Sequence, residues 1–109
     1  MKAIVVYNEQ TALTDLGSGV SRKVLCYTPE MMMVEVRFEK GGVGAMHTHP
    51  HVQSTYVKSG SFRFTIDGED VTVKEGDTIA FPSGIPHGTV CLEKGILVDV
   101  FTPMRADFV

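Results

Sequence analysis

The sequence has few of the features that define several large classes of protein. Its 109 residues contain two cysteines, Cys26 and Cys91, too few for a disulfide framework. We interpret both as free thiols in the core and therefore expect a cytoplasmic protein. The apolar run at residues 3–6 is too short for a signal peptide or a membrane span, so no membrane partner is expected. A net charge of −3, with scattered basic residues, argues against a nucleic-acid partner.

The sequence also lacks helical periodicity. Apolar and polar residues instead alternate with the period of a strand. Apolar and polar side chains alternate at 32–38 and 62–66, as in half-buried strands. Asp67-Gly68 then predicts the type I′ turn of a hairpin. Shorter strands are expected at 78–81, 89–92 and 96–101. Without a linker or a repeat, the pattern predicts one all-β domain over residues 1–109, an antiparallel sandwich or small barrel.

Histidine is scarce as well, yet three of the four histidines fall within five residues, at 47, 49 and 51. On a strand, His47 and His49 project from the same face, so both imidazoles can reach one metal ion. Pro50 disfavours a continuing central strand, and a turn there can bring Gln53 back toward the same ion. An exposed loop or an adventitious chelator would explain such a cluster equally well.

A second block of the sequence favours a metal site. Gly76 is followed after five residues by Pro82, then by Gly84, His87 and Cys91 at intervals of two, three and four positions. His87 would come from a distant strand and complete an imidazole-rich set of ligands of the kind that divalent transition metals favour.

Residues 41–60 and 76–91 together resemble the two cupin motifs, Gly-x5-His-x-His-x3,4-Glu-x6-Gly and Gly-x5-Pro-x-Gly-x2-His-x3-Asn. The sequence departs from them twice, with Gln53 at the Glu position and Cys91 at the Asn position. The resemblance implies a single cupin domain, a double-stranded β-helix with a divalent transition metal inside: nickel, zinc, manganese, cobalt or iron. The implied ligands are His47, His49, Gln53 and His87. His51 matches no ligand position, and we place it at the rim.

Longer segments resemble one cupin subfamily, the KdgF-like pectin-degradation proteins. They lie at residues 22–25, 34–41, 47–53 and 99–108. This resemblance implies an enzyme that linearises 4,5-unsaturated uronate monosaccharides, derived from pectin or alginate, to 5-keto-4-deoxyuronate. It also implies that Asp99 is catalytic and that Phe101 and Arg105 support activity.

The residues themselves are compatible with that chemistry. Because the amide oxygen of Gln53 is neutral, a site of three histidines and one glutamine keeps the full charge of a divalent ion and attracts an anion. Asp99, in phase with Leu97 and Phe101, either faces solvent or a cation, or faces the barrel interior as a general acid or base. The fork of Arg105 suits a carboxylate, unless it is a solvated tail residue.

Two other functions remain open from the sequence. One is another metal-dependent cupin, such as a dioxygenase or a sugar isomerase, and the other is a non-catalytic binder of a metal or a sugar acid. We expect Arg22 and Lys23 to be surface residues. Exposed apolar edges on a small barrel predict a homodimer, without indicating its interface.

Overall fold

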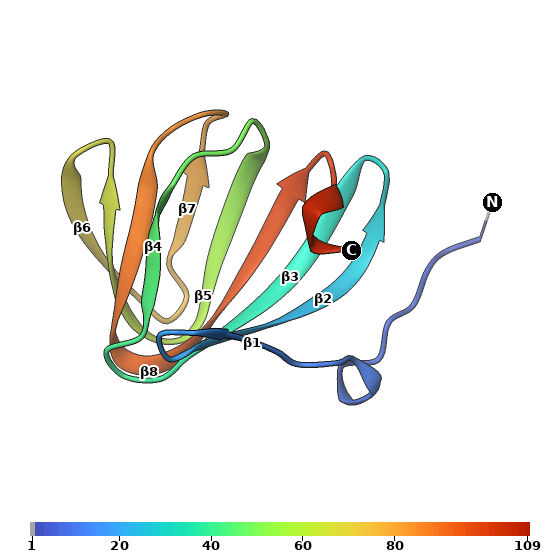
Figure 1. Cartoon of the computed structure of the whole chain (residues 1–109), viewed down its shortest axis with the longest axis horizontal. Helices are drawn as coiled ribbons and strands as arrows, with labels where there is room; N and C mark the ends of the chain where they lie inside the picture. The colour runs from blue at the N-terminus through green and yellow to red at the C-terminus, as the bar shows by residue number, and fades with distance from the viewer. Residues whose placement is uncertain (1) are drawn as a thin grey trace.

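The computed structural model describes residues 2–109, which form eight strands and two short 3₁₀ helices (Figure 1). The strands are β1 (Thr14–Gly17), β2 (Val20–Thr28), β3 (Met31–Phe38), β4 (Val43–His47), β5 (Val52–Ile66), β6 (Glu69–Lys74), β7 (Thr78–Phe81) and β8 (His87–Thr102). The helices are η1 (Asn8–Gln10) and η2 (Ala106–Phe108). Neither of them has the length and apolar character needed to cross a membrane.

The two longest strands, β5 and β8, hold the barrel together. The sheet order is β1-β2-β3-β8-β5-β6, while β4 pairs with β8 and β7 pairs with β5, all antiparallel. The first part of β8 therefore lies beside β4, and its last part lies beside β3. The sequence predicted two separate strands at 89–92 and 96–101. That prediction was wrong, because β8 continues through a bend that includes Gly95.

The alternation predicted at 32–38 places its apolar side chains inside the barrel. Met32, Val34 and Phe38 are at most 4% exposed and pack with residues of β5 and β8. Asp67 and Gly68 both have positive φ, 49° and 84°, as the type I′ turn requires. The all-β antiparallel fold predicted from the sequence is confirmed.

The two cysteines differ in their surroundings. Both are free thiols; Cys91 is buried in the core, whereas Cys26 is only partly buried. The expectation that both are core residues was therefore wrong for Cys26, which lies on β2 where the pairing with β3 shifts in register. Burial raises the pKa of the Cys91 thiol, which keeps it protonated.

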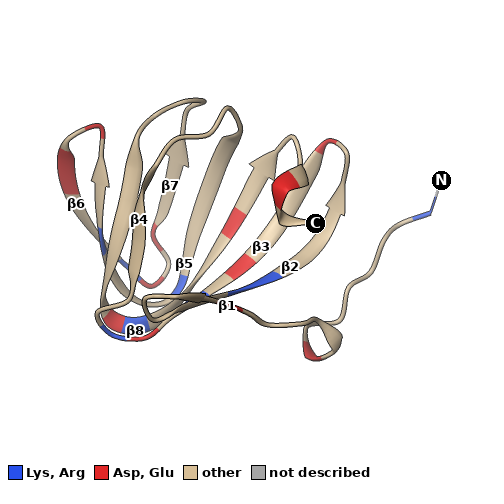
Figure 2. Cartoon of the chain, in the orientation of Figure 1, with Lys and Arg blue, Asp and Glu red and all other residues tan. Residues whose placement is uncertain are grey.

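The strands nearest the histidines contain little charge. Figure 2 shows β4 and β7 without any Asp, Glu, Lys or Arg, whereas charged residues crowd β6 and the bend of β8. An acidic side chain inside this barrel is therefore exceptional, and burial will perturb its protonation strongly.

Candidate metal centre

Three histidines converge at one end of the barrel. His47 ends β4 and lies opposite His87, the first residue of β8, while His49 follows in the loop between β4 and β5. One ring nitrogen from each lies within 4.8 Å of the others, and His51 does not belong to this set. The sequence placed His47 and His49 on one strand. Instead, β4 ends at His47, and His49 reaches the same point from the loop.

The backbone orients all three rings in the same way. The three Nδ1 atoms lie 2.8 Å from the Ala45 carbonyl oxygen, 3.1 Å from that of His51 and 2.9 Å from that of Ile85. Each Nδ1–H can donate to its carbonyl, which leaves the Nε2 lone pair for a metal ion. The Nε2 atom of His87 is buried without a hydrogen-bond partner among the described residues. A bound cation would satisfy it.

His49 provides a sharper test of whether the site fits a cation. Its Nδ1 faces the carbonyl oxygen of His51, and its Nε2 lies 2.9 Å from Oε1 of Gln53. Two acceptors therefore face one ring, which requires either an imidazolium or a neutral ring with a cation at Nε2. Burial is the main cause that lowers the pKa of both His49 and His87. The donor set thus fits a divalent transition metal held by neutral imidazoles.

The orientation of the Gln53 amide is determined by residues behind it. Thr55 Oγ1 lies 2.6 Å from Oδ1 of Asp99, and the Gln53 Nε2 atom lies 2.9 Å from the same hydroxyl. A carboxylate only accepts, so Thr55 donates its single proton to Asp99 and accepts from the Gln53 amide nitrogen. The amide oxygen of Gln53 must then point toward the imidazoles.

Asp99 lies on the inner side of β8 and lines a cavity of about 270 Å³ together with His47, His87 and Gln53. Burial, the largest effect, raises the pKa of its carboxyl to about 6, against hydrogen bonds from Thr55 and Gln53 and the charge of Arg105. The sequence left open whether Asp99 faces solvent or the interior, and the structure places it inside.

Two arginines line the same cavity. Arg105 is buried, and its Nε and Nη2 donate to the Asp107 carboxylate at 3.0 and 2.9 Å, which lowers the pKa of Asp107. Its guanidinium also lies 4.2 Å from the ring centroid of Phe108, on whose ring Arg22 packs at 3.8 Å. Burial first, and the charge of Arg105 second, lower the pKa of Arg22. Arg105 is therefore no solvated tail residue.

The expectation that Arg22 and Lys23 are surface residues was wrong. Alternation along β2 turns Arg22 toward the cavity, which it lines, while Lys23 is 8% exposed and donates to the Asn8 side-chain oxygen at 2.8 Å. Sequence reasoning also missed Thr55 and Asp107. Thr55 had a detectable signal, because it lies two positions after Gln53 on the same strand face.

The remaining predicted site residues are Phe101 and His51. Phe101 is 3% exposed, lines the cavity and packs edge-on against His49 at 5.7 Å between ring centroids. His51 is partly buried, with its Nε2 3.2 Å from the Met104 carbonyl oxygen. It thus connects the β4–β5 loop to the C-terminal segment and is less exposed than a rim residue.

This barrel with its inward histidine triad defines the class of protein. The chain belongs to the cupin family, whose Cupin domain matches residues 34–101. Within that family it is a KdgF-like cupin: it is 42% identical over 103 residues to the pectin degradation protein KdgF of Dickeya dadantii (strain 3937), covering 93% of this chain and 94% of the relative.

Solved structures agree with this placement. The structure of KdgF from Halomonas sp. matches with a TM-score of 0.94 and 34% identity, covering 99% of this chain and 100% of that one. An RmlC-like cupin from Shewanella frigidimarina matches with a TM-score of 0.93 and 39% identity, covering 99% and 97%. The cupin fold and the KdgF-like subfamily predicted from the sequence are confirmed.

Proposed function

We propose that this protein is a metal-dependent enzyme that opens the ring of 4,5-unsaturated uronate monosaccharides from pectin or alginate breakdown, giving 5-keto-4-deoxyuronate. The observation that carries the proposal is the carboxyl of Asp99, which lines the same small cavity as two of the three imidazoles, His47 and His87, and as two arginines. The Dickeya dadantii relative is a pectin degradation protein, which supports the substrate class.

The proposed metal ligands are His47, His49, His87 and Gln53. When bound, a divalent ion would supply a Lewis acid that stabilises negative charge developing on substrate oxygens. Nickel, zinc, manganese, cobalt and iron all accept such ligands. Because no anionic ligand belongs to this set, the site retains a positive charge that favours a uronate over a neutral sugar.

The substrate carboxylate has suitable partners in the cavity. The pair with Asp107 uses Nε and Nη2 of Arg105, so Nη1 remains to face a ligand. Arg22 contributes a second guanidinium, and Phe101 forms an apolar wall for one face of the sugar. A cavity of about 270 Å³ lies at the lower end of small-molecule sites, which favours a monosaccharide over a polymer.

Asp99 is the proposed proton carrier. It would accept the proton of the anomeric hydroxyl as the bond between C1 and the ring oxygen breaks, giving an aldehyde and an enolate at C5. Return of one proton to C4 completes the isomerisation, with no atom gained or lost. A carboxyl whose pKa is raised to about 6 by burial can both accept and return a proton near neutral pH.

The test is the disappearance of the alkene absorbance of an unsaturated galacturonate, measured above its spontaneous rate. We expect Asp99→Asn to lower kcat by about 100-fold or more, the contribution of one positioned acid–base group, while metal content stays unchanged. Wild-type turnover that needs oxygen would instead indicate a dioxygenase. No turnover by a metal-loaded wild-type protein on any unsaturated uronate would leave a binding protein and overturn the proposal.

We also propose a compartment and partners for the reaction. Two free thiols support a reducing compartment, and we propose the cytoplasm. The proposed partner is a small sugar acid, with neither nucleic acid nor membrane involved, and we expect the enzyme to act as a homodimer.

A further inference from the structure

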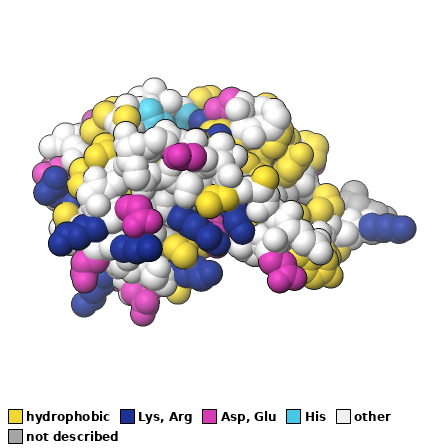
Figure 3. All heavy atoms as spheres, turned by 60° about the horizontal axis from the view of Figure 1, so that its bottom comes forward, with side chains coloured by type: hydrophobic (Ala, Val, Ile, Leu, Met, Phe, Trp, Pro, Cys, Tyr) yellow, Lys and Arg dark blue, Asp and Glu magenta, His cyan; other side chains and the backbone are white. Residues whose placement is uncertain are grey.

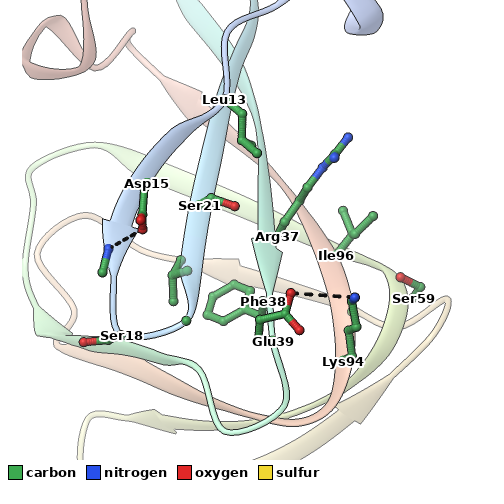
Figure 4. A pocket seen from close by; sticks show the side chains of 14 residues that line it. Leu13, Asp15, Ser18, Ser21, Arg37, Phe38, Glu39, Ser59, Lys94 and Ile96 are labelled. Atoms are coloured by element: carbon green, nitrogen blue, oxygen red, sulfur yellow. Dashed lines mark hydrogen bonds and ion pairs between the residues drawn. The ribbon is translucent and has the colours of Figure 1, made fainter.

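The recognition of an anion by this barrel depends on which cations remain available to a ligand. The larger hollow, of about 780 Å³, is lined mainly by residues of β1, β2 and β3 and of the bend of β8 (Figure 4). Its two cations, Arg37 and Lys94, each pair with a glutamate, at 2.8 and 3.6 Å. In the smaller cavity, the pair with Asp107 uses Nε and Nη2 of Arg105 and leaves Nη1 for a ligand. The placement of Arg105 therefore helps to decide where an anion binds.

Arg105 belongs to the C-terminal segment, residues 103–109, which lies outside the sheet. β8 ends at Thr102, and the segment contains only the short helix η2. Among the described residues, one hydrogen bond between backbone groups ties this segment to the barrel, from the Met104 N–H to the Pro29 carbonyl oxygen at 3.3 Å. That distance lies beyond the usual range for an N–H donor and an oxygen acceptor. The backbone before Arg105 is therefore held only weakly by this bond.

A second attachment of the segment comes from the side chain of His51. Its Nε2 lies 3.2 Å from the Met104 carbonyl oxygen. A carbonyl oxygen only accepts, so Nε2 carries the proton that it donates. Nδ1 of the same ring is buried and has no hydrogen-bond partner among residues 2–109. The ring therefore makes its hydrogen bond at Met104, the residue directly before Arg105.

His51 also contacts the histidine triad. Its ring packs edge-on against His49 and Phe101, at 5.6 and 6.3 Å between ring centroids. Its backbone carbonyl oxygen accepts from Nδ1 of His49 at 3.1 Å. One residue thus holds a proposed metal ligand through its backbone and the residue before Arg105 through its side chain. These two contacts join the triad to the segment that carries the guanidinium.

We propose that His51 is a positioning residue, which fixes the Arg105 guanidinium relative to the histidine triad and so selects a ligand whose carboxylate fits that separation. His51 does not line the cavity, so it acts through Arg105 and not on the ligand itself. Figure 3 shows histidine side chains at the surface beside acidic and basic ones, so a ligand can reach this end of the barrel from solvent. The inference rests on the proposed function only for the identity of the ligand, a uronate.

The test compares two substitutions that differ in reach. In His51→Gln, the amide nitrogen is as many bonds from Cβ as Nε2 of histidine and can still donate to the Met104 carbonyl oxygen. In His51→Asn, the amide nitrogen is one bond closer to Cβ and falls short. On an unsaturated galacturonate we expect His51→Asn to raise KM by about 10-fold, the effect of one lost hydrogen bond, with kcat nearly unchanged. His51→Gln should restore the wild-type KM, and equal KM values in the two variants would contradict the proposal.

A double-mutant cycle with Arg105→Met shows whether His51 acts through Arg105. Once the guanidinium is gone, its position no longer counts, so adding His51→Asn to Arg105→Met should raise KM no further. A further 10-fold rise in the double variant, as expected for two independent sites, would overturn the proposal.

Nuclear magnetic resonance tests the same contact without any turnover, in zinc-loaded protein. The Arg105 Nε–H donates to Asp107 at 3.0 Å, and its signal is identified by its absence from Arg105→Met. We expect this proton to exchange with water about 10-fold faster in His51→Asn than in wild type and to regain its protection in His51→Gln. Equal exchange in all three proteins, or loss of metal in His51→Asn, would overturn the proposal. If exchange responds as expected while wild type turns over no uronate, the proposed function fails and the positioning of Arg105 by His51 stands.

Discussion

At the scale of single residues, the proposed site separates two roles, metal binding and proton transfer, that one acidic ligand would combine. The residue beside the imidazoles, Gln53, is neutral, and the acid lies one hydroxyl further away, at Asp99. Thr55 connects them, and its single proton can serve only one acceptor. In the proposed reaction, the carboxyl of Asp99 would then be available for proton transfer, because it is not itself a ligand of the ion.

Burial of Asp99 lowers the free energy of unfolding by an amount that depends on pH. Its pKa rises from 3.8 in the unfolded chain to about 6 in the folded protein, so the folded state retains a proton that the unfolded state has lost. Stability from this group is complete below pH 3.8, declines as pH rises to about 6 and stays low above it. In metal-stripped protein we expect Asp99→Asn to stabilise the fold relative to wild type by about 2 kcal/mol more at pH 8 than at pH 4. Urea denaturation at both pH values measures this difference, and an equal effect at both would contradict the burial.

Much of the site could be predicted at this scale, because motif spacing is local in the sequence. The three histidines and Gln53 follow from the spacing of two blocks, and the structure brings them together. Arg22 and Asp107 could not be found in this way. Arg22 packs on Phe108, and Asp107 pairs with Arg105. Both contacts depend on how the C-terminal segment folds back over β2.

At the scale of elements, the barrel depends on a close crossing of β5 and β8. Gly95 lies where the two strands bend, and a Cβ atom there would come within 2.1 Å of the Ser59 carbonyl oxygen. The obstructing atoms belong to the backbone and cannot move aside as a flexible side chain would. Sequence periodicity predicted both halves of β8 and missed their continuity, because a strand that bends between sheets reads as two short strands.

We therefore expect Gly95→Ala to lower the free energy of unfolding by about 3 kcal/mol, the usual cost of overpacking a rigid site. Gly41→Ala is the matched control, since Gly41 has a φ of 80° and nothing within 4 Å of its Cβ position. It should lose only about 1 kcal/mol, from the left-handed backbone alone. Urea melts of the two variants measure both values, and equal losses would show that the crossing at Gly95 has more room than described.

At the scale of the whole molecule, metal binding and folding should be linked. The three imidazoles come from β4, the β4–β5 loop and β8, so an ion between them would join segments distant in the sequence. Only the folded chain brings these atoms within 4.8 Å of each other. A ligand that binds the folded state alone stabilises it.

We expect a divalent transition metal at about 100 times its Kd to stabilise metal-stripped protein by about 2.7 kcal/mol, measured as a rise in Tm. His87→Ala should abolish both the rise and the bound metal, because it removes a ligand that is buried without another partner. His51→Ala is the control, and it should retain both. The His51 imidazole faces the Met104 carbonyl oxygen and is not among the converging ring nitrogens, while the His51 backbone carbonyl that orients His49 remains in the alanine variant. Elemental analysis of the two variants decides the matter: equal metal loss would place His51 among the ligands.

The single proton of Thr55 also constrains how such a site can change by mutation. A glutamate at position 53 would place a second acceptor beside a hydroxyl that already donates to Asp99. Suppose that the acid moves from position 99 to position 53 by two successive substitutions. The intermediate variant then has two acids or none. The effects of substitutions at these two positions should not add. A glutamine beside the histidines is then physically coupled to a residue 46 positions further along the chain, because hydrogen bonds join positions 53, 55 and 99.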